Sequence, residues 1–307
     1  MEMKSAIDKY LKYLRIERNA SKHTITSYKN DLNQFLEFLS DHFGLVNQEA
    51  DINSIERITI RLWLGELTEE EYAKSSIARK VAALRSFFKY AFRRGIIERN
   101  PAHLLIVPKK NKSLPVTATP EDLNRMMEQA EGNNPRSRQD RAILELFYST
   151  GIRLSEMVGL NTGDVNLELN QIKVLGKGSK QRIVPVGAQA LDALSNHLNS
   201  RSELFGSKTD DDARKALFLA ASGQRIYPRA VQRLVKDYLM KTSEVTQKSP
   251  HVLRHSFATH LLDKGADIRV IKELLGHANL AATQVYTHTS VERLKNVYEL
   301  AHPRANQ

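Results

Sequence analysis

A proline- and lysine-rich stretch divides this chain into two helix-patterned parts. The stretch, PKKNKSLPVTATP from Pro108 to Pro120, contains three prolines and three lysines and shows no sustained apolar periodicity. Such a composition is typical of an exposed, semi-extended linker. Because 307 residues are long for a single core, we predict an N-terminal domain over residues 1–107, a linker over 108–118 and a C-terminal domain over 119–307.

Apolar residues in the N-terminal part recur at steps of three and four, which is the spacing of one buried helix face. The first such helix follows Ser21, a residue type that suits an N-cap, and ends at Gly44. The second predicted buried face comprises Ile55, Ile58 and Leu62. The third follows the capping serines Ser75 and Ser76 and comprises Ile77, Val81, Leu84, Phe87, Phe88 and Ala91. We therefore expect an all-helical N-terminal domain.

The net charge of the chain points to a polyanionic partner. There are 46 Lys and Arg residues against 35 Asp and Glu residues, which gives +11 and a pI near 9.7. Nucleic acid and an anionic membrane both fit such a charge. No stretch approaches the ~20 apolar residues that span a bilayer, and the first ten residues contain no apolar signal core. The absence of cysteine excludes disulfides, thiolate zinc sites and cysteine nucleophiles. We expect a cytoplasmic protein that does not bind membranes.

The third N-terminal helix has a strongly positive solvent face. Its basic residues are Lys74, Arg79, Lys80, Arg85, Lys89, Arg93, Arg94 and Arg99, and Glu98 is the one acidic residue among them. A charge run is most often only a solvated face. The missing counter-charges favour an anionic ligand instead, so we expect this helix to face DNA. The DNA contacts that we predict are Lys74, Arg79, Lys80, Arg85 and Lys89.

The C-terminal domain starts with a helix whose cap is Thr119 and whose first residue is Pro120. Further on, two β-prone runs, 171–175 and 181–186, are separated by a glycine-rich turn, Gly176–Lys180. This arrangement predicts a β-hairpin with Lys177 and Lys180 at its tip. The overall fold class that we expect is mainly α, with a small antiparallel β-sheet in the larger, C-terminal domain.

Four segments of the C-terminal domain concentrate side chains suited to phosphoryl transfer. They are STGIRLSE at 149–156, the Lys177 turn, HVLRH at 251–255 and LGHANLAATQVYTH at 275–288. Two arginines can bind the non-bridging oxygens of a phosphodiester and neutralise the charge of its transition state. A histidine can move a proton, a lysine can protonate a leaving alkoxide, and a tyrosine can attack phosphorus. Such a set requires no metal ion.

Each of these residues also has a simpler interpretation. Arg153 alone is a surface arginine, Lys177 a solvated turn residue, His277 a residue at a helix end, and Tyr286 a core aromatic with an exposed hydroxyl. The Lys177 turn lacks the glycine and the following Ser or Thr of a nucleotide-binding P-loop. These interpretations leave the clustering of the four segments unexplained.

A zinc site is a further alternative, because His251 and His255 stand four residues apart on one helix. No Glu follows His251, and Arg254 lies between the two histidines. The sequence therefore does not favour a metal, and we expect none.

The four segments closely resemble the tyrosine recombinase (phage integrase) family. The run SPHVLRHSFATHLLDKGADIRVIKELLGHANLAATQVYTH and the later AHPRA resemble its bacterial and archaeal XerC/XerD group in particular. The resemblance implies a C-shaped two-domain clamp around double-stranded DNA, with an N-terminal core-binding domain and a C-terminal catalytic domain. It also implies site-specific strand cleavage and rejoining through a 3′-phosphotyrosine, without a cofactor, a metal or ATP.

Roles follow from the resemblance, position by position. Arg153 and Arg254 would hold the phosphate, Lys177 would be the general acid on the 5′ oxygen, His251 the acid/base, His277 a donor to the scissile phosphate and Tyr286 the nucleophile. Glu156 matches a supporting position, and Lys180 on the same turn is a further expected DNA contact.

The partners that we expect follow from the same resemblance. Four subunits, alike or paired with a paralogue, would assemble on two DNA sites, with the C-terminal helix 291–302 docked into a neighbour. An apolar face that packs on its own domain is the other interpretation of this helix. Resolution of chromosome dimers at a dif-like site, with an FtsK-like DNA translocase, is the leading expectation. An integrase or transposase of a mobile element, a relaxing topoisomerase and a catalytically silent DNA-binding protein are the alternatives.

Overall fold

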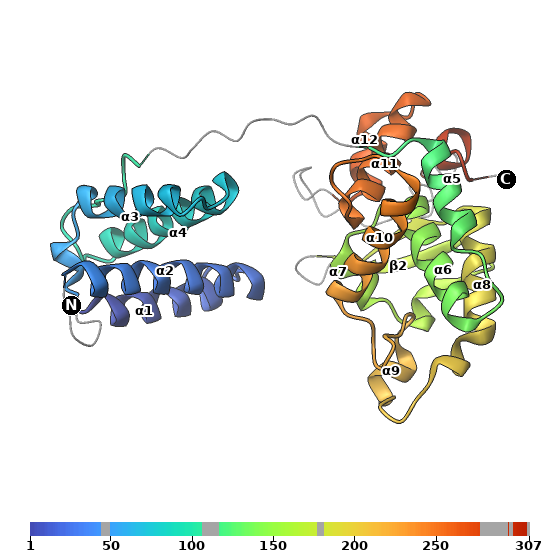
Figure 1. The fold of residues 1–307 in the computed structure, drawn as a ribbon, viewed down its shortest axis with the longest axis horizontal. Coiled ribbons are helices and arrows are strands. Elements are labelled where there is room, and N and C mark those ends of the chain that lie inside the picture. Colours follow the sequence, from blue (N-terminus) through green and yellow to red (C-terminus); the bar gives the residue numbers. More distant parts are fainter. Residues whose placement is uncertain (44–49, 106–116, 177–180, 277–293, 295–296, 306–307) are drawn as a thin grey trace. The chain divides into compact units, whose positions relative to one another are not determined.

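The computed structural model describes residues 1–43, 50–105, 117–176, 181–276, 294 and 297–305. The chain forms two compact units, Met1–Lys112 and Ser113–Gln307. The division between them falls inside the predicted linker. Figure 1 shows the helices of each unit.

The N-terminal unit is a helical bundle. Its elements are α1 (Met3–Ile16), α2 (Lys22–Phe43), the short 3-10 helix η2 (Ile52–Ser54), α3 (Arg57–Glu69) and α4 (Lys74–Arg93). The α2 helix starts where the sequence predicts, because Ser21 Oγ accepts a hydrogen bond from Thr24 N at 3.2 Å. The apolar face predicted for α4 is buried along its whole length, from Ile77 to Ala91.

Two details of the N-terminal prediction are wrong. Ile58 and Leu62 do not form the buried face of α3, because both are more than half exposed. Trp63 and Leu67 lie in the core instead, on a neighbouring apolar face of the same helix. The predicted serine caps of α4 are also wrong, since that helix starts at Lys74 and Ala73 is its N-cap.

The C-terminal unit is larger and mainly helical. Its helices are α5 (Pro120–Gln129), α6 (Pro135–Thr150), α7 (Leu154–Gly159), η3 (Thr162–Asp164), α8 (Ala188–Ser200), η5 (Arg201–Leu204), α9 (Asp211–Lys215), α10 (Pro228–Thr242), α11 (Pro250–Asp263) and α12 (Ile268–Leu274). Thr119 caps α5 as predicted, because its Oγ1 accepts a hydrogen bond from Asp122 N at 3.1 Å. The last ten residues of α6 include a continuous buried run, 142–150, at the centre of this unit's core.

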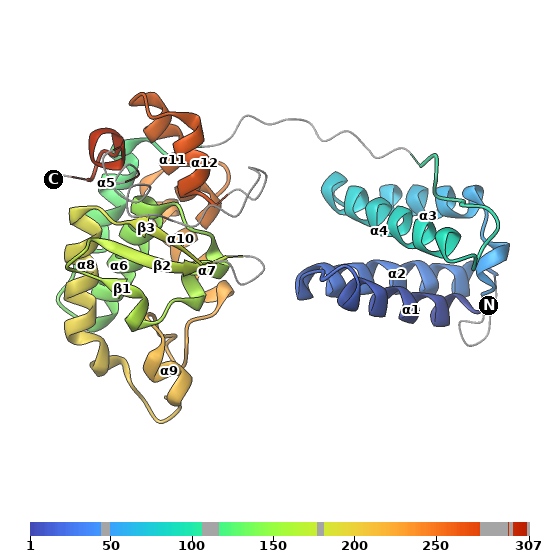
Figure 2. The same ribbon diagram turned by 180° about the vertical axis from the view of Figure 1, so that it is seen from behind.

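The predicted hairpin is present in a three-stranded antiparallel sheet. β1 (Val165–Asn166) pairs with β2 (Gln171–Leu175), and β2 pairs with β3 (Gln181–Pro185) in a register that places Val174 opposite Arg182. Figure 2 shows this sheet on the near side of the unit, with α6 behind it. The expected fold class, mainly α with a small antiparallel sheet, is therefore confirmed.

The apolar residues near the C-terminus lie in the core of their own unit. Leu294, Tyr298, Ala301 and Ala305 are all buried there. The Ala305 carbonyl accepts a hydrogen bond from the backbone N–H of Ala188 at 3.2 Å. Of the two interpretations of the C-terminal helix, this structure therefore shows packing on its own domain.

Candidate active site

Arg153 stands at a sharp chain reversal between two helices. α6 ends at Gly151, whose φ of 57° lies in the left-handed region, and Arg153 follows as the extended N-cap residue of α7. The backbone N–H of Arg153 donates to Glu156 Oε2 at 2.8 Å, and Arg153 Nη1 donates to Glu156 Oε1 at 3.0 Å. One carboxylate therefore caps α7 and holds the Arg153 guanidinium at the same time.

Gly151 lets the end of α6 approach the middle of α11 and the end of α12 closely. A Cβ atom at this position would overlap the Phe257 ring and lie 2.9 Å from Leu275 Cδ2. Glycine also accepts the left-handed φ without steric cost. The close approach allows Arg254 on α11 to donate a hydrogen bond from Nη1 to the Gly151 carbonyl.

Three arginines bind the carbonyl of the last residue of α12 and the carbonyls of the two residues that follow it. Arg182 Nε donates to the Leu274 carbonyl at 3.3 Å, Arg254 Nη2 to the Leu275 carbonyl at 2.8 Å, and Arg153 Nη2 to the Gly276 carbonyl at 2.8 Å. The last carbonyls of a helix lack intrahelical partners and carry its negative dipole end, so they attract cations. Arginines from β3, α11 and the start of α7 thereby gather at one point.

Glu156 is the counter-charge of this cluster. Its side chain is buried, with 3% of its surface exposed. Arg182 donates to it twice, Nη1 to Oε1 at 2.8 Å and Nη2 to Oε2 at 2.9 Å. Burial by itself would raise the pKa of Glu156, but the hydrogen bonds from Arg182 and Arg153 hold that pKa below its ordinary value. The carboxylate is therefore ionised at neutral pH.

The surroundings of Arg254 disfavour its charged form. Burial lowers its pKa to about 10, and the nearby positive charge of Arg153 acts in the same direction, opposed by Glu156. At neutral pH the guanidinium remains protonated. Since a guanidinium has five N–H donors, Arg153 and Arg254 each keep donors beyond those that bind the α12 carbonyls. The Arg153 side chain also keeps 38% of its surface exposed, so a ligand can reach it.

His251 and His255 lie on the exposed side of α11. His251 is in the first turn, three residues before Arg254 and thus on the same helix face. Burial lowers the pKa of His255, and the nearby His251 and Arg254 lower it further. Within the part of the chain that the structure describes, no three His, Asp or Glu side chains gather in a group able to hold a metal ion.

The remaining predicted catalytic residues, Lys177, His277 and Tyr286, lie outside the described residues, as does Lys180. Of the catalytic set, the structure thus brings together Arg153 and Arg254, with the supporting Glu156 between Arg153 and Arg182. Sequence reasoning missed Arg182. Its one signal is strand alternation, because residue 182 occupies the same face of β3 as the buried Val184. An arginine on an apolar strand face indicates a buried partner.

One of the DNA contacts predicted on α4, Lys80, is wrong because this residue is buried. This lysine is 5% exposed, and its Nζ lies 3.1 Å from Asp31 Oδ1 and donates to Gln34 Oε1. Arg79 binds the other oxygen of Asp31, and Arg94 pairs with Glu17 at the C-terminal end of α1. The counter-charges missing from α4 therefore come from α1 and α2. Lys74, Arg85 and Lys89 are exposed.

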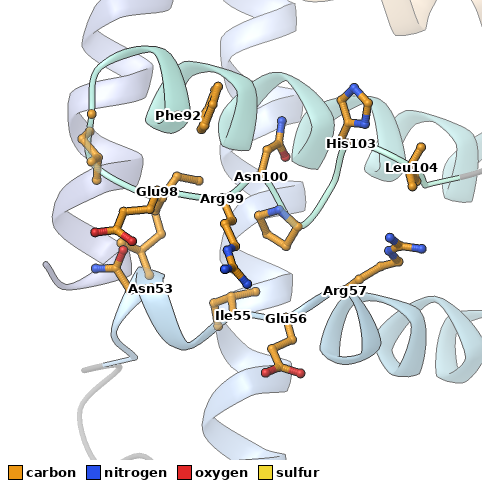
Figure 3. A pocket seen from close by; sticks show the side chains of 15 residues that line it. Asn53, Ile55, Glu56, Arg57, Phe92, Glu98, Arg99, Asn100, His103 and Leu104 are labelled. Atoms are coloured by element: carbon orange, nitrogen blue, oxygen red, sulfur yellow. The ribbon is translucent and has the colours of Figure 1, made fainter.

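A separate groove lies in the N-terminal unit, between the start of α3 and the segment that follows α4 (Figure 3). Its volume is about 1170 Å³, and both signs of charge line it: Glu56 and Glu98, and Arg57 and Arg99. None of the predicted catalytic residues lines this groove. In the described ranges, no helix is both long enough and apolar enough to cross a bilayer.

Comparison with known families matches both units of the chain. The model of the phage integrase family matches residues 117–293, and that of the phage integrase N-terminal SAM-like domain matches residues 7–95. The tyrosine recombinase XerC of Chlorobaculum tepidum is 40% identical, over 97% of this chain and 94% of the relative. The tyrosine recombinase XerC of Pelobacter propionicus is 42% identical, over 95% of this chain and 93% of the relative.

Two solved structures share the fold. The XerH site-specific recombinase bound to palindromic difH substrate aligns with a TM-score of 0.66 at 24% identity, over 95% of this chain and 84% of the other. The Tn1549 transposon integrase in complex with circular intermediate DNA aligns with a TM-score of 0.68 at 21% identity, over 94% of this chain and 98% of the other. At these identities the likeness supports the fold alone.

Proposed function

Because the chain belongs to the phage integrase family and is a tyrosine site-specific recombinase, we propose that its substrate is double-stranded DNA, cut and rejoined through a covalent link to Tyr286. The observation that carries this proposal is the meeting of Arg153 and Arg254 at the adjacent carbonyls of Gly276 and Leu275, just after α12. Two guanidinium groups from different helices are thereby fixed side by side. A phosphodiester carries one negative charge and gains a second in the transition state, which is the charge that such a pair neutralises.

Each further role in the reaction rests on the family resemblance. The Tyr286 oxygen attacks phosphorus while His251 accepts the phenolic proton, and the bond from phosphorus to the 5′ oxygen breaks. Lys177 gives that oxygen a proton, and His277 donates a hydrogen bond to the phosphate. The phosphotyrosine conserves the energy of the broken ester, so rejoining is the same step in reverse and needs no ATP.

DNA binding has electrostatic support of its own. The net charge of +11 favours a polyanion. With Lys80 excluded as buried and Arg79 paired with Asp31, the exposed Lys74, Arg85 and Lys89 are the α4 phosphate contacts that we propose. Lys180 is a further proposed contact. The XerH recombinase structure contains a palindromic difH substrate, and the Tn1549 integrase structure contains circular intermediate DNA.

The cellular role that we propose is resolution of chromosome dimers at a dif-like site. Identity of about 40% to XerC recombinases over nearly the whole chain supports it. We further propose a tetramer on two DNA sites, formed with identical subunits or with a paralogue, and activation by an FtsK-like translocase. Packing of Tyr298 and its neighbours into their own unit means that docking of this segment into another subunit requires its release first.

A nicked suicide duplex tests the chemistry. Wild-type protein should form an adduct that survives denaturation, equally in magnesium and in EDTA, and Tyr286→Phe should bind the same DNA without forming it. An adduct of normal yield from Tyr286→Phe, or one that requires magnesium, would contradict the proposal.

Sequencing of DNA trapped covalently by the protein in its host tests the cellular role. A single chromosomal site near the replication terminus would support dimer resolution. Ends of a mobile element would identify an integrase or transposase instead, and relaxation of supercoils without a specific site would identify a topoisomerase.

A further inference from the structure

Arg182 is the most deeply buried arginine of this cluster. Its side chain keeps 7% of its surface exposed, against 38% for Arg153. Arg182 donates to both carboxylate oxygens of Glu156, at 2.8 and 2.9 Å, and through Nε to the Leu274 carbonyl at 3.3 Å. Its burial and these partners keep it from binding a DNA phosphate directly.

We propose that Arg182 is a positioning residue for strand cleavage, which acts by fixing the carboxylate that holds Arg153 in place. This inference rests on the proposed function and adds a residue to which that function assigns no role.

The carboxylate of Glu156 is shared by two arginines. Its Oε1 receives Arg182 Nη1 and Arg153 Nη1, and its Oε2 receives Arg182 Nη2 and the backbone N–H of Arg153. A planar guanidinium that pairs with both oxygens fixes the rotation of the carboxylate. The plane of Glu156 then fixes the direction of the Arg153 guanidinium. Without Arg182, Arg153 alone orients the carboxylate, and the buried charge has one partner fewer.

The same guanidinium lies against the end of α12. A Cβ atom on Gly276, whose φ is 65°, would lie 2.9 Å from Arg182 Cζ. The backbone at Gly276 thus passes directly over the guanidinium, and the Gly276 carbonyl receives Arg153 Nη2. Arg182 therefore contacts the residue that precedes His277, the predicted phosphate donor.

Arg182 is also the second residue of β3. Residues 177–180, which include Lys177 and Lys180, connect β2 to β3 in the sequence, and Val174 on β2 is the register partner of Arg182. One side chain thus ties together α7, the end of α12 and the base of this hairpin, the elements next to three of the predicted catalytic residues.

Arg182→Lys tests the proposal, because lysine keeps a positive charge but replaces the planar fork by a point charge. We expect full-length Arg182→Lys to bind the nicked suicide duplex normally and to form the covalent adduct roughly 100-fold more slowly, the cost of about 1 Å of misplacement. Arg201→Lys is the matched control. Arg201 is equally buried, at 7%, and its guanidinium binds the Ala213 and Ala216 carbonyls away from the cluster.

Two modified substrates separate positioning from general loss of structure. A methylphosphonate at the scissile position carries no charge and depends less on Arg153, so the defect of Arg182→Lys should shrink on it. A sulfur in place of the 5′ bridging oxygen leaves without a proton, so it should not rescue a misplaced Arg153. In the Arg153→Lys/Arg182→Lys double variant, the loss in adduct rate should be smaller than the product of the two single losses.

Several outcomes would overturn the inference. These are an adduct rate equal to that of wild type, the same defect on all three substrates, rescue by the bridging sulfur, or an equal defect in Arg201→Lys. If the Arg182→Lys protein fails to fold, the variant Glu156→Gln/Arg182→Gln, which leaves no unpaired buried charge, must show the same substrate dependence. Absence of any adduct from wild-type protein would instead refute the proposed function.

Discussion

The Tyr298 hydroxyl lies 2.6 Å from Ser149 Oγ inside the C-terminal unit. Ser149 Oγ also accepts a hydrogen bond from the backbone N–H of Gly187 at 2.9 Å. Tyr298 is 2% exposed, so this hydroxyl network anchors the C-terminal segment to the end of α6. The segment is thus part of the core of its own unit in this structure.

Tyr298→Phe should loosen that anchor. It removes one buried hydrogen bond and leaves the Ser149 hydroxyl with one partner fewer, at a cost of about 1 kcal/mol in the free energy of unfolding. Amide hydrogen exchange of peptides from α6 and α8 would measure it. Tyr227→Phe, at an exposed tyrosine, is the control and should change nothing. Equal protection in both variants would show that the contact adds no stability.

Lys80→Met should reduce stability and leave DNA affinity unchanged. The lysine bridges Asp31 and Gln34 in the core, and its Nζ lies 5.8 Å from the centre of the Trp63 ring. Loss of hydrogen bonds to a charged group costs about 2 kcal/mol. Because Trp63 is the single tryptophan of the chain, its fluorescence during urea unfolding reports on this unit.

Lys89→Ala is the converse variant. Lys89 is exposed on α4, so we expect normal urea unfolding and a slope of log K against log salt that is smaller by about 1. A weaker salt dependence in folded Lys80→Met, or an unchanged one in Lys89→Ala, would reverse the assignment of the two lysines.

Local patterns in the sequence predicted the elements well and their partners poorly. The stripe from Ile77 to Ala91 identified the buried face of α4, because each helical turn there has apolar residues on one side only. In α3, apolar residues occupy two faces, and periodicity does not decide which one is buried. Ile58 and Leu62 were assigned to the core, whereas Trp63 and Leu67 occupy it.

Local sequence patterns also do not predict ion pairs between residues that are far apart in the chain. Lys80 and Asp31 are 49 residues apart, and Arg182 and Glu156 are 26 apart. A count of charges along one helix does not include partners from other elements, so it misses the counter-charge that Asp31 on α2 gives to α4. Arg153 and Arg254 were found from the sequence because their segments carry recognisable motifs. Arg182 carries no such motif, and only its place on an apolar strand face distinguishes it.

Gly151→Ala should disrupt the meeting point of α6, α11 and α12. Alanine at a φ of 57° is strained, and its Cβ would overlap the Phe257 ring. Together the two effects should cost roughly 3 kcal/mol in the stability of the C-terminal unit. Amide hydrogen exchange in α6 and α11 measures the loss. Gly159→Ala, where a Cβ meets nothing within 4 Å, is the matched control and should be neutral. Wild-type protection in Gly151→Ala would mean that the reversal relaxes without cost.

Glu156 should make the stability of the chain depend on pH in the acid range. Its pKa in the folded protein is held below the ordinary value of 4.5, against the effect of burial, by hydrogen bonds from Arg182 and Arg153. A carboxylate whose folded pKa is lowered contributes stability that is fully present above the unfolded pKa. That contribution is lost as the pH falls from the unfolded value through the folded one. The free energy of unfolding of the wild-type protein should therefore decrease below about pH 4.5. Urea denaturation monitored by circular dichroism measures it.

The variant Glu156→Gln removes the titrating group and should show a shallower decline in stability over the same pH range. It should also be less stable than wild type at neutral pH, because Arg182 is then buried without a counter-charge. Glu128→Gln, at an exposed glutamate on α5, is the control and should follow the wild-type curve. If Glu156→Gln lost stability with acid as steeply as wild type, the acid sensitivity would come from other carboxylates. Glu156 would then not be held ionised by the two arginines.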